Sequence, residues 1–139
     1  MVEYGKLLIL GAYGKCVVQG THELLKHAEL WSEIILAGRN MKELIKLKDQ
    51  YAQYNNISIK SLNIKFNTNK YKQEDFAPYM LSYQHLLKSS QDELNTLIQA
   101  SDLICNGLPY NCSLPVVECC IKFNKNGVDL CTGIDLMNH

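Results

Sequence analysis

The sequence lacks the features that place a chain in a membrane or on nucleic acid. No apolar run approaches the roughly 20 residues that a membrane-spanning helix requires, and the first residues lack the basic start and long apolar region of a signal peptide. Lysine plus arginine number 14, and so do aspartate plus glutamate, so no net charge attracts nucleic acid or lipid. We therefore expect a cytoplasmic protein that binds neither membranes nor nucleic acid.

Metal-binding and nucleophilic motifs are also missing. The six cysteines form no C-x-x-C pair, and Cys119 and Cys120 are adjacent, which is poor spacing for a zinc site. The four histidines are scattered and form no Ser-His-Asp or Cys-His grouping. We expect no metal site, we interpret the cysteines as small buried side chains without disulfides, and we assign no catalytic residue.

The 139 residues contain short apolar segments that alternate with amphipathic ones. The apolar segments predict strands at 6–10, 33–37, 57–64, 101–106 and 128–131. The amphipathic segments predict helices at 15–27, 41–54, 76–88 and 114–124, and the capping box Ser90-x-x-Glu93 predicts the start of one more. This order is typical of an α/β fold: one Rossmann-type domain, residues 1–139, with a parallel sheet of order 3-2-1-4-5 and helices on both faces, a three-layer α/β/α arrangement.

A glycine turn follows the first predicted strand, and a predicted helix follows the turn. This arrangement directs the unpaired N–H groups of a helix start toward a ligand and suits a pyrophosphate. In the spacing G-x-x-G-x-x-G, Gly11 and Gly14 match and Val17 does not. The candidate dinucleotide contacts in this segment are Gly11, Ala12, Tyr13, Gly14, Lys15 and Cys16.

Two of these candidates have alternative interpretations. Lys15 either pairs with the phosphate or is a solvated lysine of the first helical turn. Cys16 stands where the spacing G-x-G-x-x-G has its last glycine, so it either packs there as a slightly bulky side chain or is a thiol that the helix start makes reactive.

The end of the second predicted strand indicates which dinucleotide binds. An NAD-binding domain usually places Asp or Glu there to accept from the ribose 2′-OH, but this chain has Gly38-Arg39-Asn40. Arg39 offers a planar cation for a 2′-phosphate, and Gly38 leaves room for the ligand. These three residues are candidate contacts and favour NADP over NAD, while the alternative makes Arg39 a solvated loop residue.

The next two strand ends supply the remaining candidates. Asn63 ends the third predicted strand, where adenine edges are often contacted. The fourth ends in Asn106-Gly107-Leu108-Pro109, whose small and rigid residues suit a backbone that lies against a ligand. Asn106 is either a polar ligand contact or an ordinary cap of the loop.

Three segments together resemble one family. They are 8–14 (Leu-Ile-Leu-Gly-Ala-x-Gly), 37–40 (Ala-Gly-Arg-Asn) and 100–109 (Ala-Ser-Asp-Leu-Ile-Cys-Asn-Gly-Leu-Pro), the last leading to a Leu-Pro helix. They are similar to the N-terminal NAD(P)-binding domain of the saccharopine dehydrogenase-like family, over most of the chain except 65–89. The resemblance implies a dinucleotide cofactor and an oxidoreductase that acts on an amino-acid-derived imine or a related carbon–nitrogen bond.

The resemblance also implies what this chain does not carry. The family continues into a substrate-binding and dimerisation domain, for which 139 residues leave no room. We expect a fragment, an expressed domain or a shortened relative, without catalysis of its own, that forms a homodimer through an open sheet edge or the surface left by the missing domain. The alternatives are a non-enzymatic nucleotide-binding or regulatory module, and an interaction protein without a ligand in which the Tyr13 ring blocks the groove.

Overall fold

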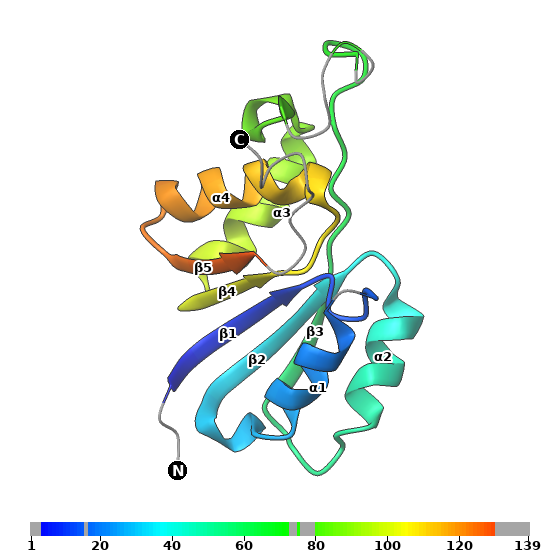
Figure 1. Ribbon diagram of the computed structural model, residues 1–139, viewed down its shortest axis with the longest axis vertical. Helices are drawn as coiled ribbons and strands as arrows, with labels where there is room; N and C mark the ends of the chain where they lie inside the picture. Colours follow the sequence, from blue (N-terminus) through cyan, green and yellow to red (C-terminus); the bar gives the residue numbers. More distant parts are fainter. Residues whose placement is uncertain (1–3, 16, 73–74, 76–79, 130–139) are drawn as a thin grey trace.

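The computed structural model describes residues 4–15, 17–72, 75 and 80–129. The five strands of this part of the chain form one parallel sheet in the predicted order β3-β2-β1-β4-β5 (Figure 1). They are β1 (Tyr4–Leu10), β2 (Trp31–Gly38), β3 (Ile57–Ser61), β4 (Leu103–Asn106) and β5 (Asn126–Asp129). Because β1 lies in the middle, the residues that follow it are flanked by those that follow β2 and β4.

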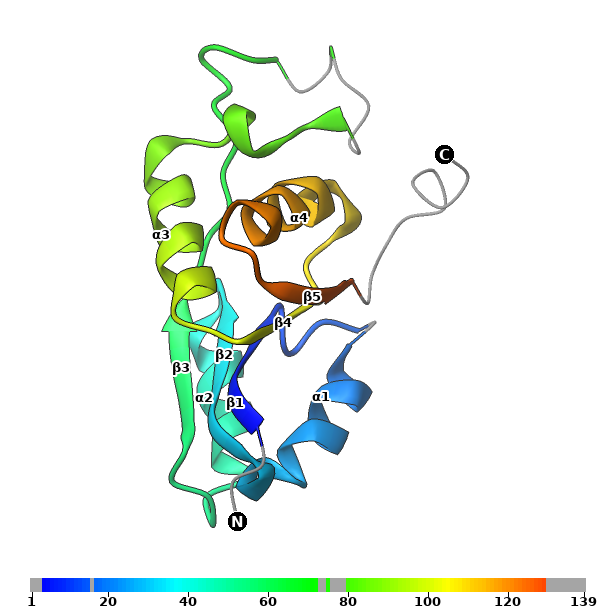
Figure 2. The ribbon, with the colours of Figure 1, turned by 90° about the vertical axis from the view of Figure 1, so that its left-hand side faces the viewer.

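Helices cover both faces of the sheet, so the Rossmann-type three-layer prediction is confirmed. The helices α1 (Val18–Leu25) and α2 (Met41–Asp49) lie on one face, and α3 (Lys88–Gln99) and α4 (Ser113–Lys122) lie on the other (Figure 2). No described helix combines the length and the apolar character that crossing a membrane requires.

The alternation of side chains along β1 explains why its whole carboxyl half is apolar. Leu7 and Ile9 point into the core beneath α1 and α2, whereas Leu8 and Leu10 point into the core beneath α3 and α4. All four are at most 1% exposed. A strand that is covered on both faces needs apolar residues at every position, and this requirement produces the run that predicted the strand.

Several predicted boundaries move by a few residues. The first helix begins at Val18 and not at Lys15, because Lys15 and Val17 still belong to turns. The third strand ends at Ser61 and not at Ile64. The fifth begins at Asn126, and the predicted residues 130–131 lie outside the described part of the chain.

The helix predicted over 76–88 is wrong within the described residues 80–87. Tyr83–His85 forms a short 3-10 helix in place of an α-helix, after which Leu86 pairs with Phe66 in an isolated antiparallel bridge. The Ser82 N–H donates to Nδ1 of the buried His85 at 2.8 Å. This local side-chain bond competes with the hydrogen bonds of a continuous helix.

The predicted capping box at Ser90 is also wrong. The helix α3 begins at Lys88, so Ser90 lies inside its first turn. The buried Ser90 hydroxyl donates to the Asn63 carbonyl oxygen at 3.0 Å and accepts from the Lys65 N–H at 2.9 Å. Ser90 therefore fixes the segment after β3 and does not cap its own helix.

The described cysteines follow the interpretation made from the sequence. Cys105, Cys112, Cys119 and Cys120 are buried and unpaired. Desolvation raises the pKa of Cys112 and Cys119 to about 11, so these thiols stay protonated at neutral pH and act as apolar side chains.

The two faces of α2 give a direct test of this packing. Leu44 is fully buried and its neighbour Ile45 is 46% exposed. We expect Leu44→Ala to lower the free energy of unfolding by about 2–5 kcal/mol because it leaves a cavity. Ile45→Ala should change it by less than about 1 kcal/mol. Urea denaturation followed by circular dichroism measures both values, and equal losses would contradict the burial of Leu44.

Candidate functional site

The glycine turn is shaped by the backbone on either side of it. Gly11 has a φ of 66°, a left-handed conformation that favours glycine, and a Cβ there would lie 2.7 Å from the Gly107 carbonyl oxygen. The Gly14 N–H donates to the Gly11 carbonyl at 2.9 Å, and a Cβ on Gly14 would crowd that oxygen at 3.2 Å. Both matching glycines of the fingerprint therefore fit a tight turn.

The missing third glycine of the fingerprint is compensated by a close contact between the start of α1 and the end of β4. Val17 holds that position in the G-x-x-G-x-x-G spacing and is 1% exposed. A Cβ on Gly107 would lie 2.6 Å and 2.7 Å from the two γ-methyl carbons of Val17. The glycine that permits close packing of helix and strand thus follows β4, and the valine fills the space it leaves.

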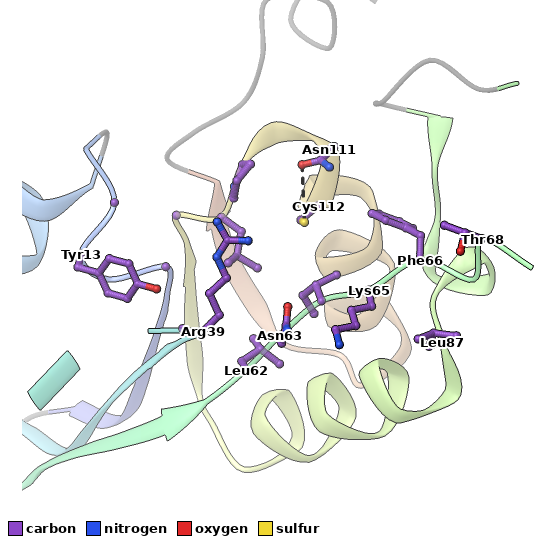
Figure 3. Close-up of a pocket in the computed structure, with 17 residues that line it drawn as sticks. Tyr13, Arg39, Leu62, Asn63, Lys65, Phe66, Thr68, Leu87, Asn111 and Cys112 are labelled. Carbon is purple, nitrogen blue, oxygen red and sulfur yellow. Dashed lines mark hydrogen bonds between the residues drawn. The ribbon is translucent and has the colours of Figure 1, made fainter. Parts of the chain in front are cut away.

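A cavity of about 770 Å³ opens beyond the carboxyl ends of the strands (Figure 3). In an open parallel sheet this is the region where ligands bind. Nine of the candidates from the sequence line it: Gly11, Tyr13, Gly14, Gly38, Arg39, Asn63, Gly107, Leu108 and Pro109. The structure therefore brings together side chains and backbone from four different strand ends.

The other candidates lie elsewhere or are not described. Ala12 is fully buried in the core beneath α1 and α2. Lys15 is exposed and does not line the cavity, and Asn40 is the N-cap of α2, where its side chain accepts from the Glu43 N–H at 3.3 Å. Cys16 lies outside the described residues.

Asn106 is turned toward the protein and not toward the cavity. Its side chain is 3% exposed. The Oδ1 atom accepts from the Leu108 N–H at 3.2 Å, and Nδ2 donates to the Asp129 carboxylate at 3.5 Å. In the structure Asn106 thus caps the loop after β4, and a contact of its side chain with a ligand stays a prediction.

Tyr13 lies across the end of β2. Its hydroxyl accepts a hydrogen bond from the Asn40 N–H at 2.9 Å. A Cβ on Gly38 would lie 2.8 Å from Cε1 of the Tyr13 ring. The space that the sequence analysis reserved for the ligand at Gly38 is therefore filled by Tyr13, while Gly11 and Gly14 still line the open cavity.

Arg39 follows β2 directly and is exposed at the cavity wall. Figure 3 draws its side chain in the space between Tyr13 and Cys112. Its charge opposes, without cancelling, the desolvation that raises the pKa of Cys112. The charged residues among the described lining are Arg39 and Lys65, with no Asp or Glu, so this wall suits an anionic ligand.

Sequence reasoning missed nearly half of the lining. The added residues come from the segment after β3, from the start of α3 and from the loop before α4. They are Leu62, Ile64, Lys65, Phe66, Thr68, Leu87, Asn111 and Cys112. The bridge between Phe66 and Leu86 and the two Ser90 hydrogen bonds hold this wall in place, and none of these contacts has a short sequence motif.

The family of the chain follows from a comparison with protein-family models. The model of the saccharopine dehydrogenase NADP binding domain matches residues 7–137. The chain belongs to this family. The resemblance stated from three segments is thus confirmed. No curated protein sequence matches the chain.

Solved structures share the family's fold at low sequence identity. Apo saccharopine dehydrogenase (L-Glu forming) from Saccharomyces cerevisiae is 15% identical with a TM-score of 0.57, and the match covers 89% of this chain and 21% of that one. Mycobacterium tuberculosis shikimate dehydrogenase is 10% identical with a TM-score of 0.54, covering 92% and 46%. Gre2 from Candida albicans is 14% identical with a TM-score of 0.54, covering 89% and 35%. The chain spans less than half the length of each.

The space around two glycines predicts opposite effects for their substitution by alanine. Gly107→Ala should lower the free energy of unfolding by about 1–3 kcal/mol or more, because the new Cβ meets Val17 and lies 2.8 Å from the Leu10 carbonyl oxygen. Gly20→Ala, on α1 with no atom within 4 Å of its Cβ, should raise it by about 0.5–1 kcal/mol. Thermal unfolding separates them, and a neutral Gly107→Ala would contradict the close contact.

Proposed function

We propose that this chain binds NADP(H) in the cavity beyond the carboxyl ends of β1, β2 and β4. The observation that carries the proposal is the chemistry at the end of β2, where Arg39 stands on a wall whose described residues include no carboxylate. An acidic residue at this position accepts from the 2′-OH of NAD, whereas an arginine accommodates a 2′-phosphate. The match to the NADP-binding family supports the same cofactor.

The residues of the cavity fit a dinucleotide on structural grounds. A Cβ at Gly11 would fill the space beside the Gly107 backbone, so the turn presents main chain and no side chain to a pyrophosphate. Arg39 is the proposed partner of the 2′-phosphate. Asn63 and Leu108, which follow β3 and β4 and line the same cavity, are the proposed neighbours of the adenine ring.

We further propose that residues 1–139 serve as the cofactor-binding domain of an oxidoreductase that acts on a carbon–nitrogen bond. When bound, NADP(H) supplies or accepts the hydride. The residues of this chain bind and orient the cofactor, and no residue is assigned a part in the chemical step. The chain spans 21% of the saccharopine dehydrogenase that shares its fold. The proposal therefore places the substrate site on a further domain.

The position of Tyr13 argues against the interpretation in which the chain has no ligand. That alternative requires the Tyr13 ring to fill the phosphate position beside the glycine turn. The ring is instead seated on Gly38, and both Gly11 and Gly14 face the cavity. The other alternative is a module that binds a different nucleotide. It is distinguished from the proposed function by which nucleotide binds most tightly.

Replacing the cation at the end of β2 tests the assignment of the cofactor. We expect Arg39→Asp to weaken NADPH binding by about 10-fold or more, the loss of a charge-assisted hydrogen bond, while NADH binding changes by less than about 3-fold. Isothermal titration of NADPH, NADH and ATP against both proteins gives the ratios.

The matched control is Lys46→Asp, which makes the same charge change on α2 outside the cavity lining. It should leave the NADPH to NADH ratio unchanged. Equal losses for both cofactors in Arg39→Asp would remove Arg39 from the 2′-phosphate site. Tighter binding of ATP than of NADPH, or no NADPH binding below about millimolar concentration, would contradict the proposed function.

A further inference from the structure

A tyrosine hydroxyl accepts a hydrogen bond from a backbone N–H at the place where the 2′-phosphate is expected. The Asn40 N–H follows Arg39 and precedes the first turn of α2. It donates to the Tyr13 hydroxyl at 2.9 Å. The Asn40 side chain accepts from the Glu43 N–H. The hydroxyl oxygen of Tyr13 therefore stands where a phosphate oxygen would accept a hydrogen bond from the same N–H.

The ring of Tyr13 is held in this position by its surroundings. Gly38 leaves the space for it, because a Cβ there would lie 2.8 Å from Cε1 and 3.2 Å from the hydroxyl oxygen. Tyr13 also lines the cavity beside Arg39 and is only partly exposed (Figure 3). One residue thus closes the gap between the glycine turn after β1 and the end of β2.

The two groups that recognise a phosphate at this end of β2 are of different kinds. Arg39 supplies a positive charge that attracts any anion. The Asn40 N–H supplies a directed donor at the start of a helix, where anions are favoured. Tyr13 leaves the first group available and takes the second. Because a charged phosphate gains more from a directed donor than a hydroxyl does, the effect of Tyr13 falls more on a ligand with a 2′-phosphate than on one with a 2′-OH.

We propose that Tyr13 is a specificity-determining residue that lowers the preference for NADPH over NADH. Its hydroxyl holds the Asn40 N–H in the free protein, and the 2′-phosphate must displace it to gain that hydrogen bond. The 2′-OH of NADH is an uncharged and weaker acceptor, so NADH gains less from the same donor. The inference rests on the proposed function, since it concerns the 2′-phosphate end of the same cavity.

The test is Tyr13→Phe, which keeps the ring on Gly38 and removes the hydroxyl. We expect NADPH to bind about 3- to 10-fold more tightly, the contribution of one freed backbone donor, while NADH binding changes by less than about 2-fold. The matched control is Tyr54→Phe. It removes a hydroxyl that donates to the Lys26 carbonyl at 2.9 Å, outside the cavity lining, and should alter neither affinity.

A measurement without any ligand checks the contact itself. In the free protein the amide proton of Asn40 should exchange with solvent faster in Tyr13→Phe than in the unaltered chain, and Tyr54→Phe should leave its rate unchanged. An equal Asn40 rate in Tyr13→Phe and the unaltered chain would overturn the inference before any cofactor is added.

The binding outcomes separate this inference from the proposed function. Measurable NADPH binding by the unaltered chain and tighter binding by Tyr13→Phe support both. An unchanged ratio of NADPH to NADH overturns only the role of Tyr13. Weaker NADPH binding by the variant also overturns it, because the hydroxyl would then donate to the phosphate. Failure of every variant to bind either cofactor overturns the proposed function together with this inference.

Discussion

Two glycines, Gly11 after β1 and Gly107 after β4, are in close backbone contact at the carboxyl ends of these neighbouring strands. The Gly11 N–H donates to the Ala37 carbonyl at 2.8 Å, and the Gly107 N–H donates to the Leu10 carbonyl at 2.7 Å. The end of β1 is thereby tied to both neighbouring strands. Val17 packs into the space beside Gly107, so the start of α1 depends on the same contact.

The candidate site follows from this contact. Because no side chain separates the two strand ends, the glycine turn presents its main chain at the cavity, and Arg39 and Asn63 approach from the adjacent ends. The family's third glycine is absent from the turn, but the close packing it permits is present. Val17, the N-cap of α1, and Gly107, which follows β4, together produce this close packing. A motif confined to the glycine turn does not describe it.

The sheet was predictable from local sequence because its physical cause is local. Apolar runs such as Leu7 to Leu10 arise when both faces of a strand are covered, and their order along the chain with right-handed connections leaves few topologies. Ser90 was misinterpreted because its hydroxyl bonds to residues of another segment, Asn63 and Lys65. Within the described residues 80–87, the expected helix is absent partly for a similar reason, since Leu86 pairs with Phe66 from another segment.

The same distinction applies to the site. Gly11, Gly14 and Arg39 were found because a turn and a strand end have recognisable sequences. Phe66, Leu87 and Cys112 reach the cavity only through tertiary packing, so no spacing along the chain indicates them. Gly38 lines the cavity, but the ring of Tyr13 fills the space that it leaves. The sequence does not indicate this contact, because the two positions are 25 residues apart.

We propose that a dinucleotide binds at the joined ends of β1, β2 and β4. Two-dimensional NMR of the ¹⁵N-labelled chain, titrated with NADPH, tests this most directly. The account predicts that the largest shifts fall on the backbone amides of Gly11, Gly14, Arg39 and Gly107. Unchanged amides at these positions, or shifts centred on the groove between α4 and β5 around Val117 and Val128, would contradict it.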